Sequence, residues 1–154
     1  MSDRNPTLPT QLDLERYVPG LITFLANKLS AGASNLYRKE FGVGIVEWRI
    51  IALLAVENNI TANYICSVIG LDKALVSRTV KNLKNQQLVT LAKSKADSRH
   101  LLIALTARGT ELHSHMIKVA LSRETRLLEV LSQEEKETLI NLLQRLNNQV
   151  AELK

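Results

Sequence analysis

The stretch from Ile60 to Leu105 constrains the fold more than any other part of this 154-residue chain. It reads as two short helices separated by a Gly-Leu turn, followed by two strands that enclose a basic and polar loop over residues 93–99. Small Cys66 allows the two helices to cross closely, and Gly70, four residues later, supplies the positive φ that the turn requires. The stretch therefore predicts a helix-turn-helix followed by a β-hairpin wing.

The positive charge of the chain is concentrated in the same stretch. Residues 61–100 hold 7 of the 20 Lys and Arg residues but only 2 of the 15 Asp and Glu residues, which gives them a net charge of +5. The other 13 basic and 13 acidic residues cancel. A localised positive field is the usual footprint of nucleic-acid binding. The alternative is a compact helical hairpin with a solvated basic face, but the tight helix spacing and the hairpin favour double-stranded DNA as the partner.

The composition is that of a mainly helical globular protein, with 45% apolar and 23% charged residues. No apolar run approaches the roughly 20 residues that are needed to cross a bilayer. The amino terminus lacks the basic start and apolar middle of a signal peptide. A single cysteine excludes an internal disulfide and fits a reducing compartment. We therefore expect a cytoplasmic protein without a membrane partner.

Apolar residues at steps of three and four, together with capping residues, predict the order of the elements. Thr61 and Asp72 are suitable N-caps, and Ser132 with Glu135 matches a capping box. The predicted elements are a helix over 12–37 that begins or bends at Pro19, helices over 46–57, 61–69 and 73–86, strands over 89–92 and 100–105, a long helix from Thr106 to about Leu131, and a last helix after Ser132.

The helix after the turn is the predicted recognition helix, whose apolar side points inward through Val76, Val80 and Leu83. Its polar side would meet the major groove, where Arg78 suits a guanine and Ser77 several bases. In the wing, the planar and permanently charged Arg99 suits a narrow minor groove. The residues that we expect to contact DNA are Thr61, Lys73, Ala74, Ser77, Arg78, Lys81, Lys93, Lys95, Asp97 and Arg99.

Asp97 is an unexpected acid in a loop that should approach phosphates. One interpretation is that it pairs with a neighbouring arginine and fixes its direction, since such charge-assisted pairs give geometric specificity. The other is ordinary turn chemistry, because Asp is common in loops. We favour the pairing.

Residues 46–109 resemble the MarR family of bacterial transcription regulators. The likeness rests on the helix with Trp48-Arg49-Ile50-Ile51-Ala52-Leu53-Leu54, the helix-turn-helix, Asp97-x-Arg99, and Leu105-Thr106-x-x-Gly109. The flanking helices resemble the family's dimerisation domain, which extends the likeness to nearly the whole chain. The resemblance implies a homodimer on a pseudo-palindromic operator, with recognition helices in adjacent major grooves and wings over minor grooves. It also implies release when a small molecule, often an aromatic acid, binds between the two domains.

We accordingly expect a mainly α fold that contains a winged helix-turn-helix with a small β-hairpin wing. The expected parts are a flexible tail over 1–11, a winged-helix DNA-binding domain over 41–106, and dimerising helices over 12–40 and 107–154. Apolar stripes on the first, fifth and sixth helices exceed what one small domain can cover, which favours an obligate dimer. The expected function is a homodimeric repressor that a small ligand releases from DNA.

Two positions depart from the family pattern. Gln87 stands where the family usually has Gly after the recognition helix, so the helix end lacks the residue that most easily adopts a positive φ. Leu91 stands where a basic residue is common at the start of the wing. This change removes one phosphate contact, which Lys93 and Lys95 could replace.

Other chemistry has weaker support in the sequence. Cys66 could act as a redox switch, but we expect an inert core residue at the helix crossing. His113 and His115 point in different directions on a helix and His100 stands alone, so we expect no metal site. No phosphate loop, nucleophile elbow or carboxylate pair indicates an enzyme, and no cofactor is expected. Trp48 is interpreted as a core anchor. A winged-helix module that binds protein in place of DNA is the remaining alternative.

Overall fold

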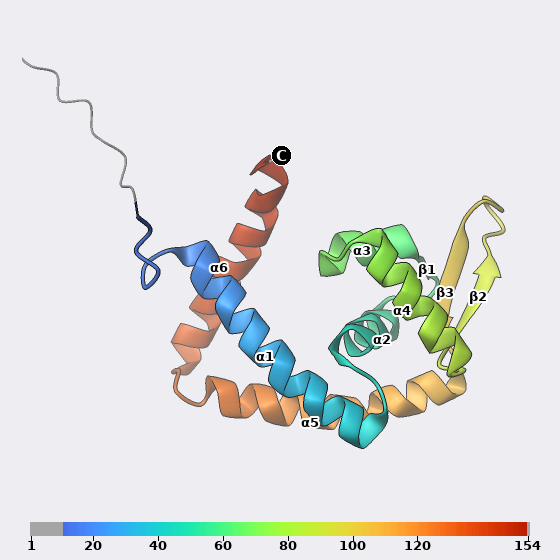
Figure 1. Ribbon diagram of the computed structural model, residues 1–154, viewed down its shortest axis with the longest axis horizontal. Coiled ribbons are helices and arrows are strands. Elements are labelled where there is room, and N and C mark those ends of the chain that lie inside the picture. Colours follow the sequence, from blue (N-terminus) through green and yellow to red (C-terminus); the bar gives the residue numbers. More distant parts are fainter. Residues whose placement is uncertain (1–10, 154) are drawn as a thin grey trace, which may run out of the picture. The chain divides into compact units, whose positions relative to one another are not determined.

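The computed structural model describes residues 11–153, so the predicted tail over 1–11 lies almost entirely outside the described residues. The chain forms two compact units, one that ends at Thr110 and one that begins at Glu111. The elements in chain order are α1 (Val18–Phe41), α2 (Ile45–Val56), β1 (Ile60–Thr61), α3 (Ala62–Ile69), α4 (Lys73–Asn85), β2 (Val89–Lys93), β3 (Leu101–Leu105), α5 (Ala107–Leu128), α6 (Gln133–Gln149) and the 3-10 turn η1 (Val150–Leu153) (Figure 1). The predicted mainly α fold with a small β-wing is confirmed.

The sheet of the first unit has three antiparallel strands in the order β1-β3-β2. The expected hairpin is present, with Val89 opposite Leu105 and Lys93 opposite Leu101. The third strand, β1, was not predicted. It has only two residues, and it exists as a strand because Ile60 pairs with a residue of β3 far along the chain. A segment this short carries no alternating pattern of its own.

The core of the first unit brings α2, α3, α4 and the sheet together. Val76, Val80 and Leu83 are buried, as the sequence predicted for the inner face of α4. The other aliphatic side chains of this core are Ile50, Ile51, Leu54, Ile65 and Ile103. Burying a side chain of this size stabilises a fold by about 1.5–3 kcal/mol, so α4 is held firmly by one face while its other face stays in solvent.

The helix ends follow the predicted capping chemistry. The Thr61 hydroxyl oxygen accepts a hydrogen bond from the Tyr64 backbone N–H (3.2 Å), and Asp72 accepts one from the Leu75 N–H (2.9 Å). Gly70 closes α3 with φ of 75°. The turn between α3 and α4 is therefore determined by three local residue choices.

The first helix differs from its predicted limits. It begins at Val18, with Pro19 in its first turn, and continues to Phe41, where Gly42 closes it with φ of 72°. Residues 12–17 precede the helix and do not form its first turns. Proline is tolerated in a first turn, where its missing N–H has no helical partner, but it would break a helix that started earlier.

Two side chains are less buried than predicted. Cys66 is only partly buried, and the fully buried residue at this crossing is its neighbour Ile65. Successive residues on a helix point about 100° apart, so a shift of one position moves a side chain from the core to its edge. Trp48 is half-buried and packs edge-on against the buried ring of Tyr37, with 5.9 Å between the ring centroids.

The second unit contains most of α5, together with α6 and η1. The capping box at the start of α6 is confirmed, because the Glu135 N–H donates to the Ser132 hydroxyl and the Ser132 N–H donates to the Glu135 carboxylate. Val150 and Leu153, predicted at the end of the last helix, fall in the 3-10 turn η1. Within residues 11–153, no helix is both long and apolar enough to cross a membrane.

Candidate nucleic-acid interface

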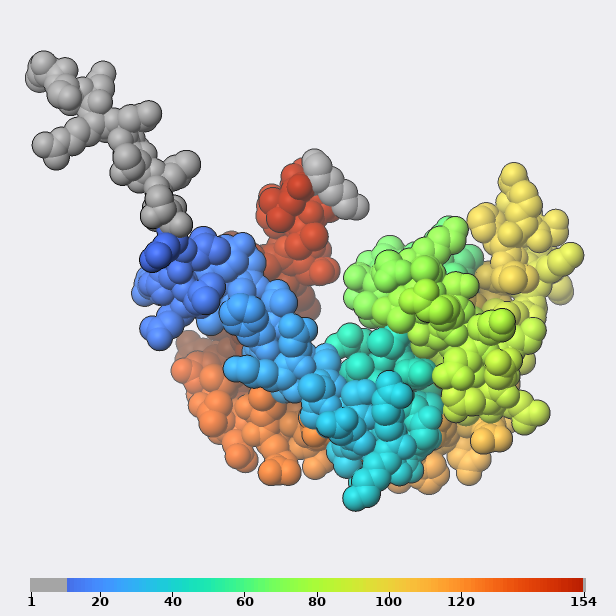
Figure 2. All heavy atoms as spheres, in the orientation of Figure 1, coloured from blue at the N-terminus to red at the C-terminus, as the bar shows by residue number. Residues whose placement is uncertain are grey.

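The solvent-facing side of α4 carries the residues that were predicted to read DNA. Lys73, Ala74, Ser77, Arg78 and Lys81 are all exposed, because the opposite side of the same helix is anchored in the core. Figure 2 shows α4 at the molecular surface, with the wing loop projecting beside it. The result is a rigid helix that offers a row of polar and cationic side chains to solvent.

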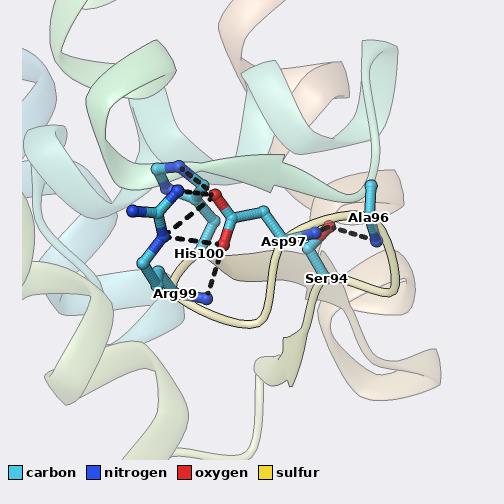
Figure 3. Close-up of polar contacts among 5 residues, drawn as sticks. All are labelled: Ser94, Ala96, Asp97, Arg99 and His100. Carbon is cyan, nitrogen blue, oxygen red and sulfur yellow. Dashed lines mark hydrogen bonds and ion pairs between the residues drawn. The ribbon is translucent and has the colours of Figure 1, made fainter.

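The tip of the wing is organised around the carboxylate of Asp97 (Figure 3). Arg99 donates from Nε to Oδ1 (3.0 Å) and Oδ2 (3.2 Å), and from Nη2 to Oδ2 (2.9 Å). The backbone N–H of Arg99 also donates to Oδ1 (3.0 Å), and Nε2 of His100 lies 3.5 Å from Oδ2. The predicted pairing of Asp97 with an arginine is thus present, and the same carboxylate also makes the turn contact of the alternative interpretation.

These contacts keep the pair ionised. The Arg99 side chain and then its backbone N–H hydrogen-bond the carboxylate, which lowers the pKa of Asp97. The same side-chain contact raises the pKa of Arg99. The Arg99 side chain is 86% exposed, and no described residue hydrogen-bonds its Nη1 atom. Asp97 therefore holds one edge of the guanidinium and leaves the other edge available to a ligand.

A second set of hydrogen bonds shapes the loop itself. The Ser94 hydroxyl oxygen accepts from the backbone N–H groups of Ala96 (3.2 Å) and Asp97 (3.4 Å). The Ser94 N–H in turn donates to the His100 carbonyl oxygen (2.9 Å). The loop is closed at both sides of Asp97, so the direction of Arg99 is set by backbone as well as by side-chain contacts.

The base of the wing is joined to the first turn of α5. The Thr106 hydroxyl donates to the Gln87 carbonyl oxygen (2.7 Å) and accepts from the Gly109 N–H (2.9 Å). A Cβ atom at position 109 would overlap the carbonyl oxygen of Leu88, so only glycine fits there. The Leu105-Thr106-x-x-Gly109 pattern thus has a physical role, which is to bring α5 against the end of the recognition segment.

Gln87 adopts the positive φ for which glycine is usually preferred. Its φ is 60°, and its N–H donates to the Lys84 carbonyl oxygen (2.9 Å). The helix end is therefore completed by a strained non-glycine residue, which the Thr106 contact helps to hold.

Leu91 lines a shallow cavity of about 260 Å³ between α4 and the sheet. The buried Val80 and Ile103 form part of its apolar lining, and Ser77 and Lys81 of α4 also border it. Leu91 is half-buried there, whereas Lys93 at the end of β2 and Lys95 in the loop are exposed. Lys93 and Lys95 are therefore the cationic groups near Leu91 on the wing that a phosphate can reach.

One of the predicted DNA-contacting residues has a structural role. Thr61 is half-buried, and its side-chain oxygen already caps α3. Within residues 11–153, no group of three or more His, Cys, Asp or Glu side chains could hold a metal ion. DNA contacts by the ten predicted residues stay a prediction.

Sequence reasoning missed one contact of α4. Nδ2 of Asn82 donates to Oε1 of Glu47 on α2 at 3.3 Å. The two residues are 35 positions apart, and nothing in either local pattern indicates that they meet. His100 was also interpreted as isolated, although its spacing of three from Asp97 could have suggested their contact.

A family model and solved structures both match this chain, and they agree on the family. A sequence model described as the MarR family matches residues 41–100. A crystal structure of a MarR/EmrR family transcriptional regulator from Acinetobacter sp. ADP1 is 38% identical, with a TM-score of 0.86, and the match covers 92% of this chain and 99% of that one. Among curated proteins, no sequence matches.

Two more distant structures share the fold. The MepR–DNA complex from S. aureus is 20% identical with a TM-score of 0.76, and the match covers 91% of this chain and 99% of that one. The PcaV transcriptional regulator from Streptomyces coelicolor, in complex with its natural ligand, is 18% identical with a TM-score of 0.76, and the match covers 91% and 98%. The arrangement of α4 and the wing therefore belongs to a fold that recurs in sequences of low identity.

Proposed function

Because the chain belongs to the MarR family of transcriptional regulators, we propose that it binds double-stranded DNA in a sequence-specific manner and acts as a homodimeric repressor. The observation that carries this proposal is the exposed polar side of α4 together with an ordered, cationic wing in the same unit. Helix and wing supply the two kinds of contact that winged-helix proteins use: base edges in the major groove and the backbone or minor groove beside it.

The site residues divide by role under this proposal. Ser77 and Arg78 read base edges, while Lys73, Lys81, Lys93 and Lys95 contact phosphates. Arg99, directed by Asp97, enters the minor groove. The MepR–DNA complex supports this division only through the shared fold, since the identity is 20%.

The dimer is supported by apolar side chains that remain in solvent. In α1, Leu21, Ile22 and Leu25 are exposed, and in the second unit α6 has no buried residue at all. Apolar stripes of this kind are typical of association surfaces. We propose that residues 12–40 and 107–154 form the dimer, that residues 41–106 bind DNA, and that the operator is pseudo-palindromic.

A small ligand, such as an aromatic acid, is proposed to release the protein from its operator. PcaV supports this through the shared fold and its bound natural ligand. A thermal-shift screen of aromatic acids and related metabolites tests the proposal, because a ligand that binds only the folded state raises its stability. Each hit is then added to the operator complex, and hits that stabilise the protein but leave the complex intact would contradict the release mechanism.

Salt dependence tests DNA binding itself. Operator DNA is first obtained by selection from a random duplex library. If about six to ten phosphates are contacted, raising salt from about 50 to 200 mM should weaken binding by about 10³–10⁵-fold. A DNA affinity that does not change with salt, or a selection that enriches no sequence, would favour a winged-helix module that binds protein.

The wing has a matched pair of variants. Arg99→Ala should weaken binding to the operator and to unrelated DNA alike. Asp97→Asn keeps the charge of Arg99 but removes its anchoring carboxylate. Compared with Glu40→Ala, which also removes one exposed negative charge, it should therefore weaken binding to both DNAs, by a smaller factor than Arg99→Ala. Affinities equal to those of Glu40→Ala would show that Asp97 does not direct the arginine.

A further inference from the structure

Glu47 connects the recognition helix to the helix that precedes the helix-turn-helix. Its Oε1 atom accepts the hydrogen bond from Nδ2 of Asn82, at 3.3 Å. The other side-chain bonds of α4 are local: Asp72 caps the first turn, and the Thr79 hydroxyl donates to the Leu75 carbonyl oxygen. The Glu47–Asn82 bond, by contrast, links α4 to another helix.

The second carboxylate oxygen of Glu47 lies close to Gly44. Glu47 lies in the first turn of α2, next to the buried Gly44. A Cβ atom at position 44 would come within 2.9 Å of both Oε2 of Glu47 and Nη2 of Arg38, so both charged groups reach into the space that a side chain would fill. Arg38 is itself tethered, since its Nε donates to the Ser34 hydroxyl on α1 (3.4 Å). Glu47 therefore lies between a guanidinium of α1 and an amide of α4.

Asn82 is well placed to control the orientation of α4. It follows Arg78 by four residues, so the two side chains lie one turn apart along the same side of the helix. Side-chain tips lie about 6 Å from the helix axis, and a rotation of about 10° therefore moves them by roughly 1 Å. The aliphatic contacts of Val76, Val80 and Leu83 are not directional, whereas a hydrogen bond weakens steeply when its geometry changes. The hydrogen bond to Glu47 therefore resists rotation of α4 about its axis more strongly than the apolar contacts of the core do by themselves.

We propose that Glu47 is a positioning residue for sequence recognition: through Asn82 it fixes the rotation of α4, so that Ser77 and Arg78 meet the same base edges in every complex. The proposal rests on the proposed DNA-binding function. It assigns no contact between Glu47 and DNA. Base contacts depend on side-chain placement to within a fraction of an ångström, while phosphate contacts by flexible lysines do not.

A distinctive signature follows from the negative charge of Glu47. Removing it raises the net charge of the protein by one, which favours binding to any DNA through the phosphates. Removing the positioning contact lowers affinity only for the correct sequence. In Glu47→Ala the affinity for the correct sequence should therefore fall while the affinity for other DNA is kept or rises, so that the two affinities approach each other. General damage to the fold would lower both.

The experiment uses the whole 154-residue chain and two DNA duplexes: the consensus that the wild-type protein selects from a random library, and a scrambled version of it. Their affinity ratio is measured for wild type, Glu47→Ala, Glu47→Gln, Asn82→Ala and the double alanine variant. We expect Glu47→Ala to lower the ratio by about two- to tenfold, the value of one net hydrogen bond, without weakening binding to the scrambled duplex.

Two variants separate positioning from charge. Glu47→Gln keeps an oxygen that accepts from Asn82 and should retain most of the wild-type ratio. Glu40→Ala removes an exposed acid elsewhere in the same unit and should change both affinities by the same factor. The double alanine variant should lose no more specificity than Glu47→Ala alone, because both changes break one bond.

The proposal is overturned by an unchanged ratio in Glu47→Ala, by equal losses for both duplexes, or by additive effects in the double variant. Thermal unfolding of each variant checks the fold. If Glu47→Ala is unfolded, the same bond is tested by Asn82→Ala, whose position is exposed. A wild-type protein that selects no consensus would instead contradict the proposed function, and this inference with it.

Discussion

Helices α4 and α6 carry similar amphipathic patterns but reach opposite states of burial. On α4, Val76 and Leu83 are 0% exposed. On α6, Leu142, Leu143 and Leu146 are each 45% exposed, and no residue of the helix is buried. The pattern by itself therefore specifies that a helix has an apolar face. It does not specify whether the same chain supplies the surface that covers it.

The difference matches the two proposed roles. α4 has its apolar face held by its own unit, which leaves its polar face rigid and open for DNA. α6 has a solvated polar face and an apolar face without cover within residues 11–153, which is the surface expected of a helix that associates with a second copy. Variants of α4 and α6 test this contrast.

Charges on the apolar face of α6 should abolish the dimer. Two carboxylates in the double variant Leu143→Asp and Leu146→Asp would have to lose their hydration at the interface, at a cost of several kcal/mol per ion. Sedimentation equilibrium should show monomers, and operator affinity should fall by orders of magnitude because each monomer can hold only one half-site. Asn148→Asp, an exposed position on the opposite side of the helix, serves as the control. If the double variant still forms a dimer, α6 is not part of the interface.

The corresponding truncation on α4 should destabilise the unit itself. Leu83→Ala removes a fully buried side chain and should lower the free energy of unfolding by about 2–5 kcal/mol. The loss in thermal midpoint should be the same at every protein concentration. In Leu143→Ala, by contrast, the loss should grow on dilution, since it acts through the dimer. If the loss in thermal midpoint depended equally on protein concentration in both variants, the two helices would not differ in how their apolar faces are covered.

The polar face of α4 should determine sequence preference. Arg78→Ala should cost about 1–3 kcal/mol, chiefly at one base position, because a bidentate contact to guanine would be lost. Lys81→Ala provides the comparison, since a lost phosphate contact weakens all sequences alike. Selection from a random library reads out the consensus for each. An unchanged consensus for Arg78→Ala would mean that the orientation assigned to α4 is wrong.

The end of α4 should tolerate glycine at one position only. Gln87→Gly relieves a positive φ that costs an ordinary residue about 1–2 kcal/mol, while the unfolded chain gains about 0.5–1 kcal/mol of backbone freedom. We expect a net stabilisation of up to about 1 kcal/mol in denaturant unfolding. Gln86→Gly, at φ of −80°, should instead destabilise. No stabilisation by Gln87→Gly would show that the strain at Gln87 is negligible. Stabilisation by Gln86→Gly as well would show that the gain does not come from the positive φ.

The features that were predictable from the sequence are those that a few neighbouring residues determine. Thr61 and Asp72 cap their helices, and Gly70 turns the chain, because each acts on backbone groups within three or four positions. The pairing of Asp97 with Arg99 was predictable for the same reason. None of these contacts requires a residue from a distant segment.

The errors concern burial at the edge of the core and pairing across long separations. Cys66 was assigned to the core, but the precise rotation of α3 buries Ile65 instead. Strand β1 was missed because two residues become a strand only when β3 lies beside them. These outcomes depend on how separate elements pack, and a local pattern contains no information on that.

The basic stretch from α3 to the wing was thus determined by the sequence in nearly every element, since caps, turns and apolar spacing are local and chemically specific. Tertiary structure decided three further things: the strained φ of Gln87, the close approach of Gly109 to Leu88, and the contact of Glu47 with Asn82. The last two join segments that are far apart in the chain, and the carbonyl oxygen of Gln87 is held by Thr106. These contacts form only when the core packs, so they cannot be predicted from a local residue pattern.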